Sequence, residues 1–132
     1  MSSEAAEVLL VDDSKVMREM IAACLRPEQG LVFSHAGSGL EAIERLSLKQ
    51  FDLVILDLNM PDIGGIEVVE FIRGQDKLRQ LPILIVTTRG DDRSRSRALE
   101  VGASQFMTKP FSPDELLGAV RVLLRRAEVA RV

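Results

Sequence analysis

The stretch Leu53-Val54-Ile55-Leu56-Asp57 places four consecutive apolar residues directly before a carboxylate. Two other runs are apolar without alternation, Val8-Leu9-Leu10-Val11 and Ile83-Leu84-Ile85-Val86. Strands of a parallel sheet are buried on both faces and contain continuous apolar runs, whereas half-exposed strands alternate. These three runs therefore predict central strands of a parallel sheet that helices cover on both faces.

Strand-like and helix-like segments alternate along the chain. Strands are predicted at five places, of which the second and fifth are more polar and are expected at or near the sheet edges: Glu7–Val11, Leu31–Ala36, Asp52–Leu56, Pro82–Thr87 and Ser104–Thr108. Apolar residues at helical spacing follow each of them, and the polar stretch 73–81 is either a helix tail or a loop. Repeated strand–helix units imply a parallel sheet with right-handed crossovers, so we predict one α/β domain with a doubly wound five-stranded sheet.

The helix ends carry recognisable caps. Ser38–Glu41 and Ser112–Glu115 have the spacing of capping boxes, and Asp91 or Asp92 is a candidate cap before the fourth helix. The apolar face predicted for the first helix includes Met20, and the last helix is expected to end near Arg126.

Composition and charge limit the classes of function. The chain has 132 residues, 46% apolar and 28% charged, so we expect a single domain over residues 1–132 with its core at 7–126. The net charge of −3 argues against nucleic-acid binding, and the absence of Trp and Tyr removes the usual stacking platforms for flavins. Cys24 cannot form an internal disulfide, the N-terminus lacks signal-peptide features, and no apolar run reaches the ~20 residues of a membrane span. We expect a cytoplasmic protein without membrane insertion, and a monomer by default.

Polar side chains stand at the ends of four predicted strands. Asp12 and Asp13 follow the first strand, Asp57 follows the third, Thr87 ends the fourth and Lys109 follows the fifth. Ligands of open α/β sheets bind outside the carboxyl ends of the strands, so these side chains are expected to converge at one edge. Taken alone, the acidic pair at 12–13 is also a common way to place negative charge at a helix N-terminus.

The charges of this set suggest a chemistry. Two carboxylates ~4 Å apart repel each other by roughly 4 kcal/mol at an effective dielectric of ~20. A hard divalent cation offsets such repulsion, and Mg²⁺ suits a site of carboxylates, waters and a phosphate. Lys109 adds a compact positive charge and Thr87 a hydroxyl donor, both suited to phosphoryl oxygens. The set predicts a Mg²⁺-dependent phosphoryl-transfer site.

Four motifs, in order, resemble the receiver domains of response regulators of the chemotaxis CheY type. They are Val-Asp-Asp-Ser at 11–14, Asp-Leu-Asn-Met-Pro-Asp at 57–62 followed by Gly64-Gly65, Val-Thr-Thr at 86–88 and Lys-Pro-Phe at 109–111. The resemblance spans about Glu7 to Arg126 and implies a flavodoxin-like (βα)5 fold with strand order 2-1-3-4-5. It also implies two-component signalling, with a histidine kinase or phosphotransfer protein as phosphoryl donor and an output protein downstream.

The resemblance assigns roles at the acidic edge. Asp57 would be the phosphoacceptor. Asp12, Asp13, Asp57 and the backbone carbonyl of Asn59 would hold one Mg²⁺. Lys109 would contact the phosphoryl oxygens, and the peptide bond after it is typically cis in this family.

It also assigns a switch. Thr87 would move toward the phosphoryl group, and the ring of Phe106 would swing inward in response. Asn59 and Arg89 occupy positions that vary in the family and tune the lifetime of the phosphate.

From these roles we expect a stand-alone receiver. Phosphorylation would change the surface formed by Arg89–Phe106 and Ser112–Arg126, and this surface would control a partner protein. The protein would not be an enzyme in the ordinary sense, because it would catalyse only its own phosphorylation and dephosphorylation.

Two alternative functions stay open at this point. A haloacid-dehalogenase-type phosphatase needs Asp-x-Asp after the first strand, whereas this chain has Asp12-Asp13-Ser14. A phosphate-independent interaction module would keep the same residues and signal by binding alone.

His35 has no partner at metal-ligand spacing and is expected at the surface or at a strand edge.

Overall fold

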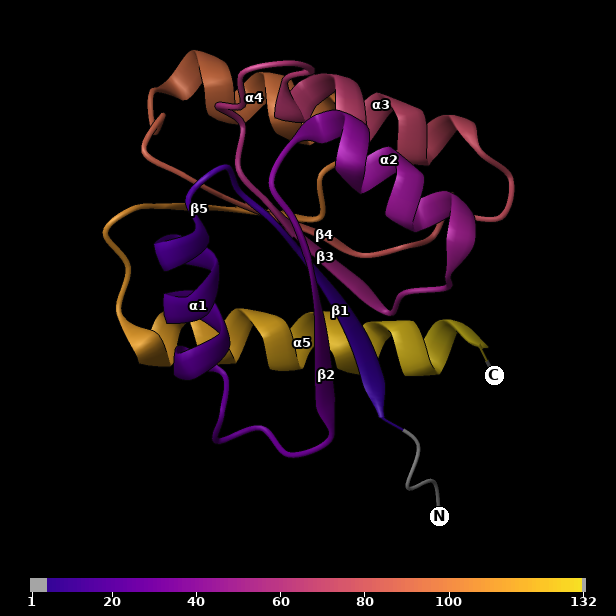
Figure 1. Cartoon of the computed structure of the whole chain (residues 1–132), viewed down its shortest axis with the longest axis vertical. Coiled ribbons are helices and arrows are strands. Elements are labelled where there is room, and N and C mark those ends of the chain that lie inside the picture. The colour runs from indigo at the N-terminus through magenta and orange to yellow at the C-terminus, as the bar shows by residue number, and fades with distance from the viewer. Residues whose placement is uncertain (1–4, 132) are drawn as a thin grey trace.

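Within residues 5–131, which the computed structural model describes, five parallel strands alternate with five helices (Figure 1). Side chains are described for residues 5–125. The strands are β1 (Ala6–Val11), β2 (Leu31–Ala36), β3 (Leu53–Leu56), β4 (Ile83–Thr87) and β5 (Gln105–Thr108). The helices are α1 (Lys15–Cys24), α2 (Gly39–Leu48), α3 (Gly65–Gly74), α4 (Asp92–Val101) and α5 (Pro113–Arg131). Each strand starts within one residue of its predicted position.

The strand order is β2-β1-β3-β4-β5, and all neighbouring strands are parallel. This order confirms the predicted doubly wound α/β fold and places the two more polar strands, β2 and β5, at the edges. In the centre, β3 pairs with β1 from Leu53 to Leu56 and with β4 from Val54 to Leu56. The carboxyl ends of β1, β3, β4 and β5 therefore meet at one edge.

Helices cover both faces of the sheet, with α2, α3 and α4 on one face and α1 and α5 on the other (Figure 1). Alternate residues of the central strands point into two separate core clusters. The cluster beneath α2, α3 and α4 takes Leu9, Val11, Val54, Leu56, Ile83 and Ile85. The cluster beneath α1 and α5 takes Val8, Leu10, Leu53, Ile55, Leu84 and Val86. Because both faces are buried, the apolar runs need no alternation.

Side-chain caps begin α1, α2, α4 and α5, whereas α3 begins without one. One predicted capping box differs from expectation. Ser112 and Glu115 form the full capping box, since each backbone N–H donates to the other residue's side chain, at 3.1 and 3.0 Å. Ser38 Oγ accepts from the backbone of Glu41 at 3.1 Å, but the Glu41 carboxylate accepts from the N–H of Gly37 instead of from Ser38. The predicted box at Ser38 is therefore only half formed.

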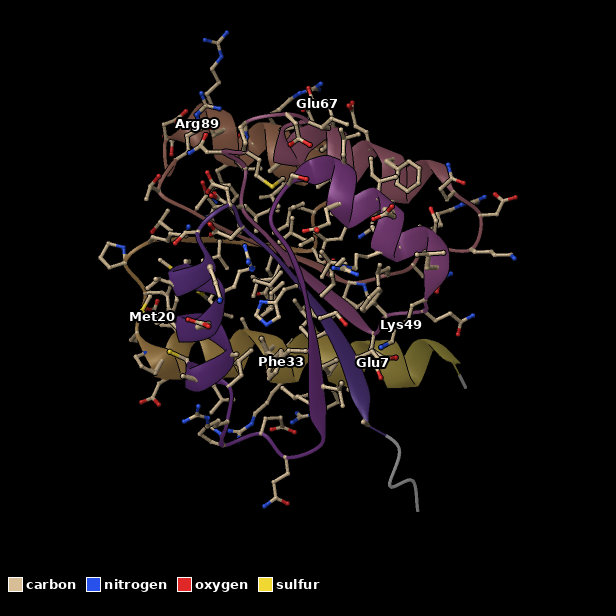
Figure 2. The ribbon with its side chains drawn as sticks, in the orientation of Figure 1. Glu7, Met20, Phe33, Lys49, Glu67 and Arg89 are labelled. Carbon is tan, nitrogen blue, oxygen red and sulfur yellow. The ribbon has the colours of Figure 1, made fainter. Side chains whose placement is uncertain are left out.

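Two helix expectations are corrected. Met20 is 44% exposed and projects outward from α1 (Figure 2), because the buried stripe of this helix runs through Ile21 and reaches Leu25 just beyond its end. Helix α5 continues to Arg131 rather than ending near Arg126, since its last residues include no Gly or Pro that would stop it. Among the helices within residues 5–131, none is long and apolar enough to cross a membrane.

The polar stretch after α3 is a loop organised by one arginine. The Arg73 guanidinium donates to the carbonyls of Leu81 at 2.7 Å, Arg79 at 3.0 Å and Gly102 at 2.9 Å. Burial lowers the pKa of Arg73 from its ordinary value. One side chain thus ties the loop between α3 and β4 to the end of α4.

We predict that Arg73→Met lowers the free energy of unfolding by about 2 kcal/mol, because partly buried carbonyls lose their donor. The matched control is Arg97→Met, which removes a half-exposed contact with Glu70 at 3.6 Å and should cost less than about 0.5 kcal/mol. Urea unfolding measures both variants. Equal, small effects would contradict the role given to Arg73.

Candidate functional site

Three carboxylates meet where β1 and β3 end. Ligand oxygens of Asp12, Asp13 and Asp57 all lie within 4.8 Å of one another. Asp12 is 3% exposed and Asp57 6%, whereas Asp13 is exposed. The pairing of β1 with β3 fixes this arrangement, because the N–H of Asp57 donates to the carbonyl of Val11 at 3.0 Å. The structure therefore brings together the three acids that the sequence placed at separate strand ends.

Lys109 enters the same cluster from the end of β5. Its Nζ lies 2.7 Å from Asp12 Oδ2 and 3.6 Å from Asp57 Oδ2. The side chain is only 11% exposed, and the peptide bond to Pro110 is cis, as the resemblance implies. One positive charge thus faces three negative charges in a largely buried site.

The remaining acceptor positions of the two buried acids are held by local backbone. Asp12 Oδ1 accepts from the N–H of Ser14 at 2.9 Å, and Asp57 Oδ1 accepts from the N–H of Asn59 at 3.3 Å. Their Oδ2 atoms face Lys109. Each carboxylate is therefore oriented by one backbone donor and shares the lysine through its other oxygen.

A glycine lets α3 begin directly beside Asp57. A Cβ atom on Gly65 would lie 2.5 Å from the carbonyl oxygen of Asp57 and 2.7 Å from Cα of Leu58. The N–H of Gly65 also donates to the carbonyl of Leu58 at 3.0 Å. This close approach of helix and loop explains why the motif has glycine at position 65.

The donor set fits a hard divalent cation. All three potential ligand atoms are carboxylate oxygens, the type that Mg²⁺ prefers. Lys109 alone leaves the cluster with two uncompensated negative charges, which a divalent cation would neutralise. The expected ligation by the Asn59 carbonyl stays a prediction.

Thr87 ends β4 and is fully buried. Its Oγ1 accepts from the backbone N–H of Arg89 at 3.2 Å. The side chain of Arg89 is exposed and extends away from the body of the protein (Figure 2). The hydroxyl predicted to bind the phosphoryl group is therefore held at the carboxyl end of β4, while Arg89 points into solvent.

Phe106 lies in the core cluster beneath α4 and is 9% exposed. The guanidinium of Arg95, from α4, lies 5.5 Å from the centroid of its ring, within the range of a cation–π contact. The ring is thus directed inward in this structure, and its movement as a switch stays a prediction.

Comparison with known proteins identifies this arrangement. The family model described as the response regulator receiver domain matches residues 8–121. The chain belongs to the response-regulator receiver family. Receivers are the signal-accepting domains of two-component systems and bind Mg²⁺ at an acidic pocket, which agrees with the donor set described above.

The chain is similar to part of two transcriptional regulatory proteins. It is 35% identical to the transcriptional regulatory protein GltR of Pseudomonas aeruginosa, over 100% of this chain and 54% of GltR. It is 33% identical to the phosphate regulon transcriptional regulatory protein PhoB of Escherichia coli, over 92% of this chain and 53% of PhoB. The chain thus spans about half the length of these curated relatives.

A solved structure shows the same fold over nearly its whole length. The chemotaxis response regulator CheY4 of Vibrio cholerae superposes with a TM-score of 0.82 and 34% identity, covering 90% of this receiver and 98% of CheY4. The five-stranded order and the covering helices are therefore those of a CheY-like receiver.

The sequence did not reveal what Asp62 does. This residue closes the motif at 57–62 but lies outside the acidic cluster. Its carboxylate accepts from the N–H groups of Gly39 and Leu40, each at 3.0 Å, and so caps the start of α2. These hydrogen bonds, that of Leu40 first, lower the pKa of Asp62 to about 2.

The Asp62 cap predicts a specific pH dependence. Because its folded pKa is about 2, the ionised carboxylate adds stability that is complete above its unfolded pKa and is lost as the pH falls from about 4 to about 2. The Asp62→Asn variant carries an amide that does not titrate. The difference in unfolding free energy between the two proteins should therefore shrink over this range, and a constant difference would contradict the cap.

Charge repulsion among the clustered carboxylates should lower the stability of the folded protein, and Asp57 contributes to it. Three carboxylates face one lysine there, so Asp57→Asn should raise the stability of the metal-free receiver by about 1 kcal/mol and reduce the stabilisation by added Mg²⁺. Asp76→Asn, at a side chain 89% exposed, is the control and should change stability little. Urea unfolding with and without Mg²⁺ measures both. A metal-free Asp57→Asn receiver less stable than the original would contradict the repulsion.

Proposed function

We propose that this receiver accepts a phosphoryl group on Asp57 from a phosphohistidine of a histidine kinase or phosphotransfer protein. The observation that carries the proposal is the position of Lys109, whose Nζ lies 2.7 Å from Asp12 and 3.6 Å from Asp57 inside a buried carboxylate cluster. A lysine in that position supplies positive charge where a phosphoryl group on Asp57 would bring additional negative charge.

The transfer is a substitution at phosphorus. A carboxylate oxygen of Asp57 forms a P–O bond while the P–N bond of the phosphohistidine breaks, and the departing imidazole nitrogen keeps the electron pair and takes up a proton. The chemistry that a bound Mg²⁺ supplies is neutralisation of charge on the phosphoryl oxygens and on the carboxylates of Asp12 and Asp13. Lys109 and the hydroxyl of Thr87 would contact the same phosphoryl oxygens.

This division of roles uses few acid–base groups. The cluster consists of carboxylates and one lysine, and each buried carboxylate is already oriented by a backbone N–H. Positioning and electrostatic stabilisation are what phosphoryl transfer mainly requires. We propose, in addition, that the receiver catalyses only its own phosphorylation and dephosphorylation, with Asn59 and Arg89 influencing the lifetime of the phosphate.

Output would proceed through a partner protein. Phosphorylation would shift Thr87 and Phe106 and so change the surface of Arg89–Phe106 and Ser112–Arg126, of which the side chain of Arg126 lies outside the described residues. Acidic residues are interspersed among the arginines of α4, which supports a protein partner over nucleic acid. Stand-alone action stays a prediction, because the curated relatives carry about as much chain again outside the matched part.

The alternative of a haloacid-dehalogenase-type phosphatase is less well supported. Such an enzyme carries its nucleophile in an Asp-x-Asp motif after β1, whereas the sequence there is Asp12-Asp13-Ser14. The match of the receiver family over residues 8–121 also favours Asp57 as the acceptor. Turnover of small phosphomonoesters would favour the phosphatase.

The test is transfer from a phosphorylated histidine kinase in the presence of Mg²⁺. We expect Mg²⁺-dependent label on the receiver and none on Asp57→Asn, because the acceptor oxygen is lost. Asp62→Asn is the matched control, since it removes a nearby carboxylate outside the cluster and should retain the label. Undiminished label on Asp57→Asn would overturn the assignment. Absence of any Mg²⁺-dependent response to a beryllofluoride mimic would favour the phosphate-independent module.

A further inference from the structure

An arginine outside the acidic cluster reaches the backbone of one of its members. Arg18 lies on α1, four residues after the cap Ser14, and helical side chains tilt toward the N-terminus of their helix. Its guanidinium therefore extends back over the loop that carries Asp12. We propose that Arg18, held by His35, is a positioning residue that fixes the backbone of Asp12 for cation binding. This inference rests on the proposed function.

Two hydrogen bonds define the bridge. Arg18 Nη1 donates to the backbone carbonyl of Asp12, and Arg18 Nε donates to Nδ1 of His35 at 3.1 Å. His35 belongs to the edge strand β2, as the sequence predicted for it, and its own carbonyl accepts from Nε of Arg45 at 3.0 Å. Arg18 thus links α1, the acidic loop and β2 through two donors of one planar group.

The carbonyl of Asp12 needs such a partner. The β1–β2 ladder ends with the pair Val11 and Ala36, and the N–H of Asp12 makes the last contact, to the Ala36 carbonyl at 3.1 Å. The side-chain oxygens of Asp12 are engaged by Ser14 and Lys109. Arg18 supplies the donor that the sheet no longer provides, so every polar group of Asp12 has a fixed partner.

His35 can accept this hydrogen bond only when Nδ1 carries no proton. Burial, and next the positive charge of Arg18, lower the pKa of His35 from its ordinary value, with smaller contributions in the same direction from Lys15 and Arg45 and an opposing one from Glu19. The imidazole is therefore neutral at neutral pH, with its proton on Nε2. Protonation would remove the acceptor and place a second positive charge beside the guanidinium.

The direction in which Mg²⁺ affinity changes when Arg18 is replaced separates a positioning role from a purely electrostatic effect. Arg18 is a positive charge near a site for a cation, so its charge alone disfavours Mg²⁺, and removing it would tighten binding. If Arg18 positions Asp12, removing it weakens binding instead. We expect Arg18→Met to raise the Kd for Mg²⁺ about threefold to tenfold at neutral pH, measured by calorimetry. An unchanged or tighter Kd would overturn the inference.

A control and a second readout keep the result specific. Arg121→Ala removes another arginine with a carboxylate partner, Glu28 in the turn after α1, and should leave the Kd unchanged. In the absence of metal, the backbone amide hydrogen of Ser14 should exchange with solvent faster in Arg18→Met, because the loop is no longer hydrogen-bonded through Arg18 to β2. Unchanged exchange at Ser14 would also count against positioning.

The pH profile tests the part played by His35. In the original receiver, Mg²⁺ affinity should fall as His35 gains a proton, below about pH 6.5. His35→Gln offers an acceptor that does not titrate, so its affinity should fall less over the same range. Parallel profiles would refute the role of His35.

The proposed function and this inference can fail separately. If the original receiver takes no phosphoryl group on Asp57, the proposed function fails. If it is phosphorylated but Arg18→Met binds Mg²⁺ as tightly as the original, only the inference fails.

Discussion

The crowding of Asp12, Asp13 and Asp57 is the constraint on which the rest of this receiver depends. Their ligand oxygens lie within 4.8 Å of one another, and Lys109 alone opposes them. At an effective dielectric of ~20 each close pair of carboxylates costs several kcal/mol, so the fold must hold them together against their repulsion. Under the proposed function, that repulsion would make the site respond to a cation and to a phosphoryl group, because both change the balance of charge.

The sheet supplies the rigidity that this crowding needs. Strands β1, β3 and β4 are buried on both faces, and the two buried acids, Asp12 and Asp57, follow β1 and β3 directly. A hydrogen bond from Asp57 to Val11 carries the β1–β3 pairing into the site, and Gly65 lets α3 begin in contact with the Asp57 backbone. The bridge from Arg18 to His35 extends this support to β2. The site is thus a continuation of the sheet rather than a flexible loop cluster.

The sequence predicted the features that depend on the spacing of apolar residues or on the polar residues directly after a strand. Continuous apolar runs gave the parallel sheet, and the polar residues after them, Lys109 included, gave the acidic edge. Contacts between a long side chain and a distant backbone carbonyl have no period, so the bridging roles of Arg18 and Arg73 were not predicted. Met20 was assigned to the core because helical spacing alone does not fix the width of the buried stripe, and the structure exposes it. Strand order came from the family resemblance, since spacing alone leaves several orders possible.

The most direct measurement of the central claim is the amide NMR spectrum of the receiver with Mg²⁺, and then with Mg²⁺ and beryllofluoride. The account predicts that Mg²⁺ shifts the amides beside Asp12, Asp13 and Asp57, and that beryllofluoride extends the shifts to Thr87 and Lys109 at the ends of β4 and β5. Shifts confined to other parts of the surface, or none, would contradict a cation and phosphoryl site built on these carboxylates.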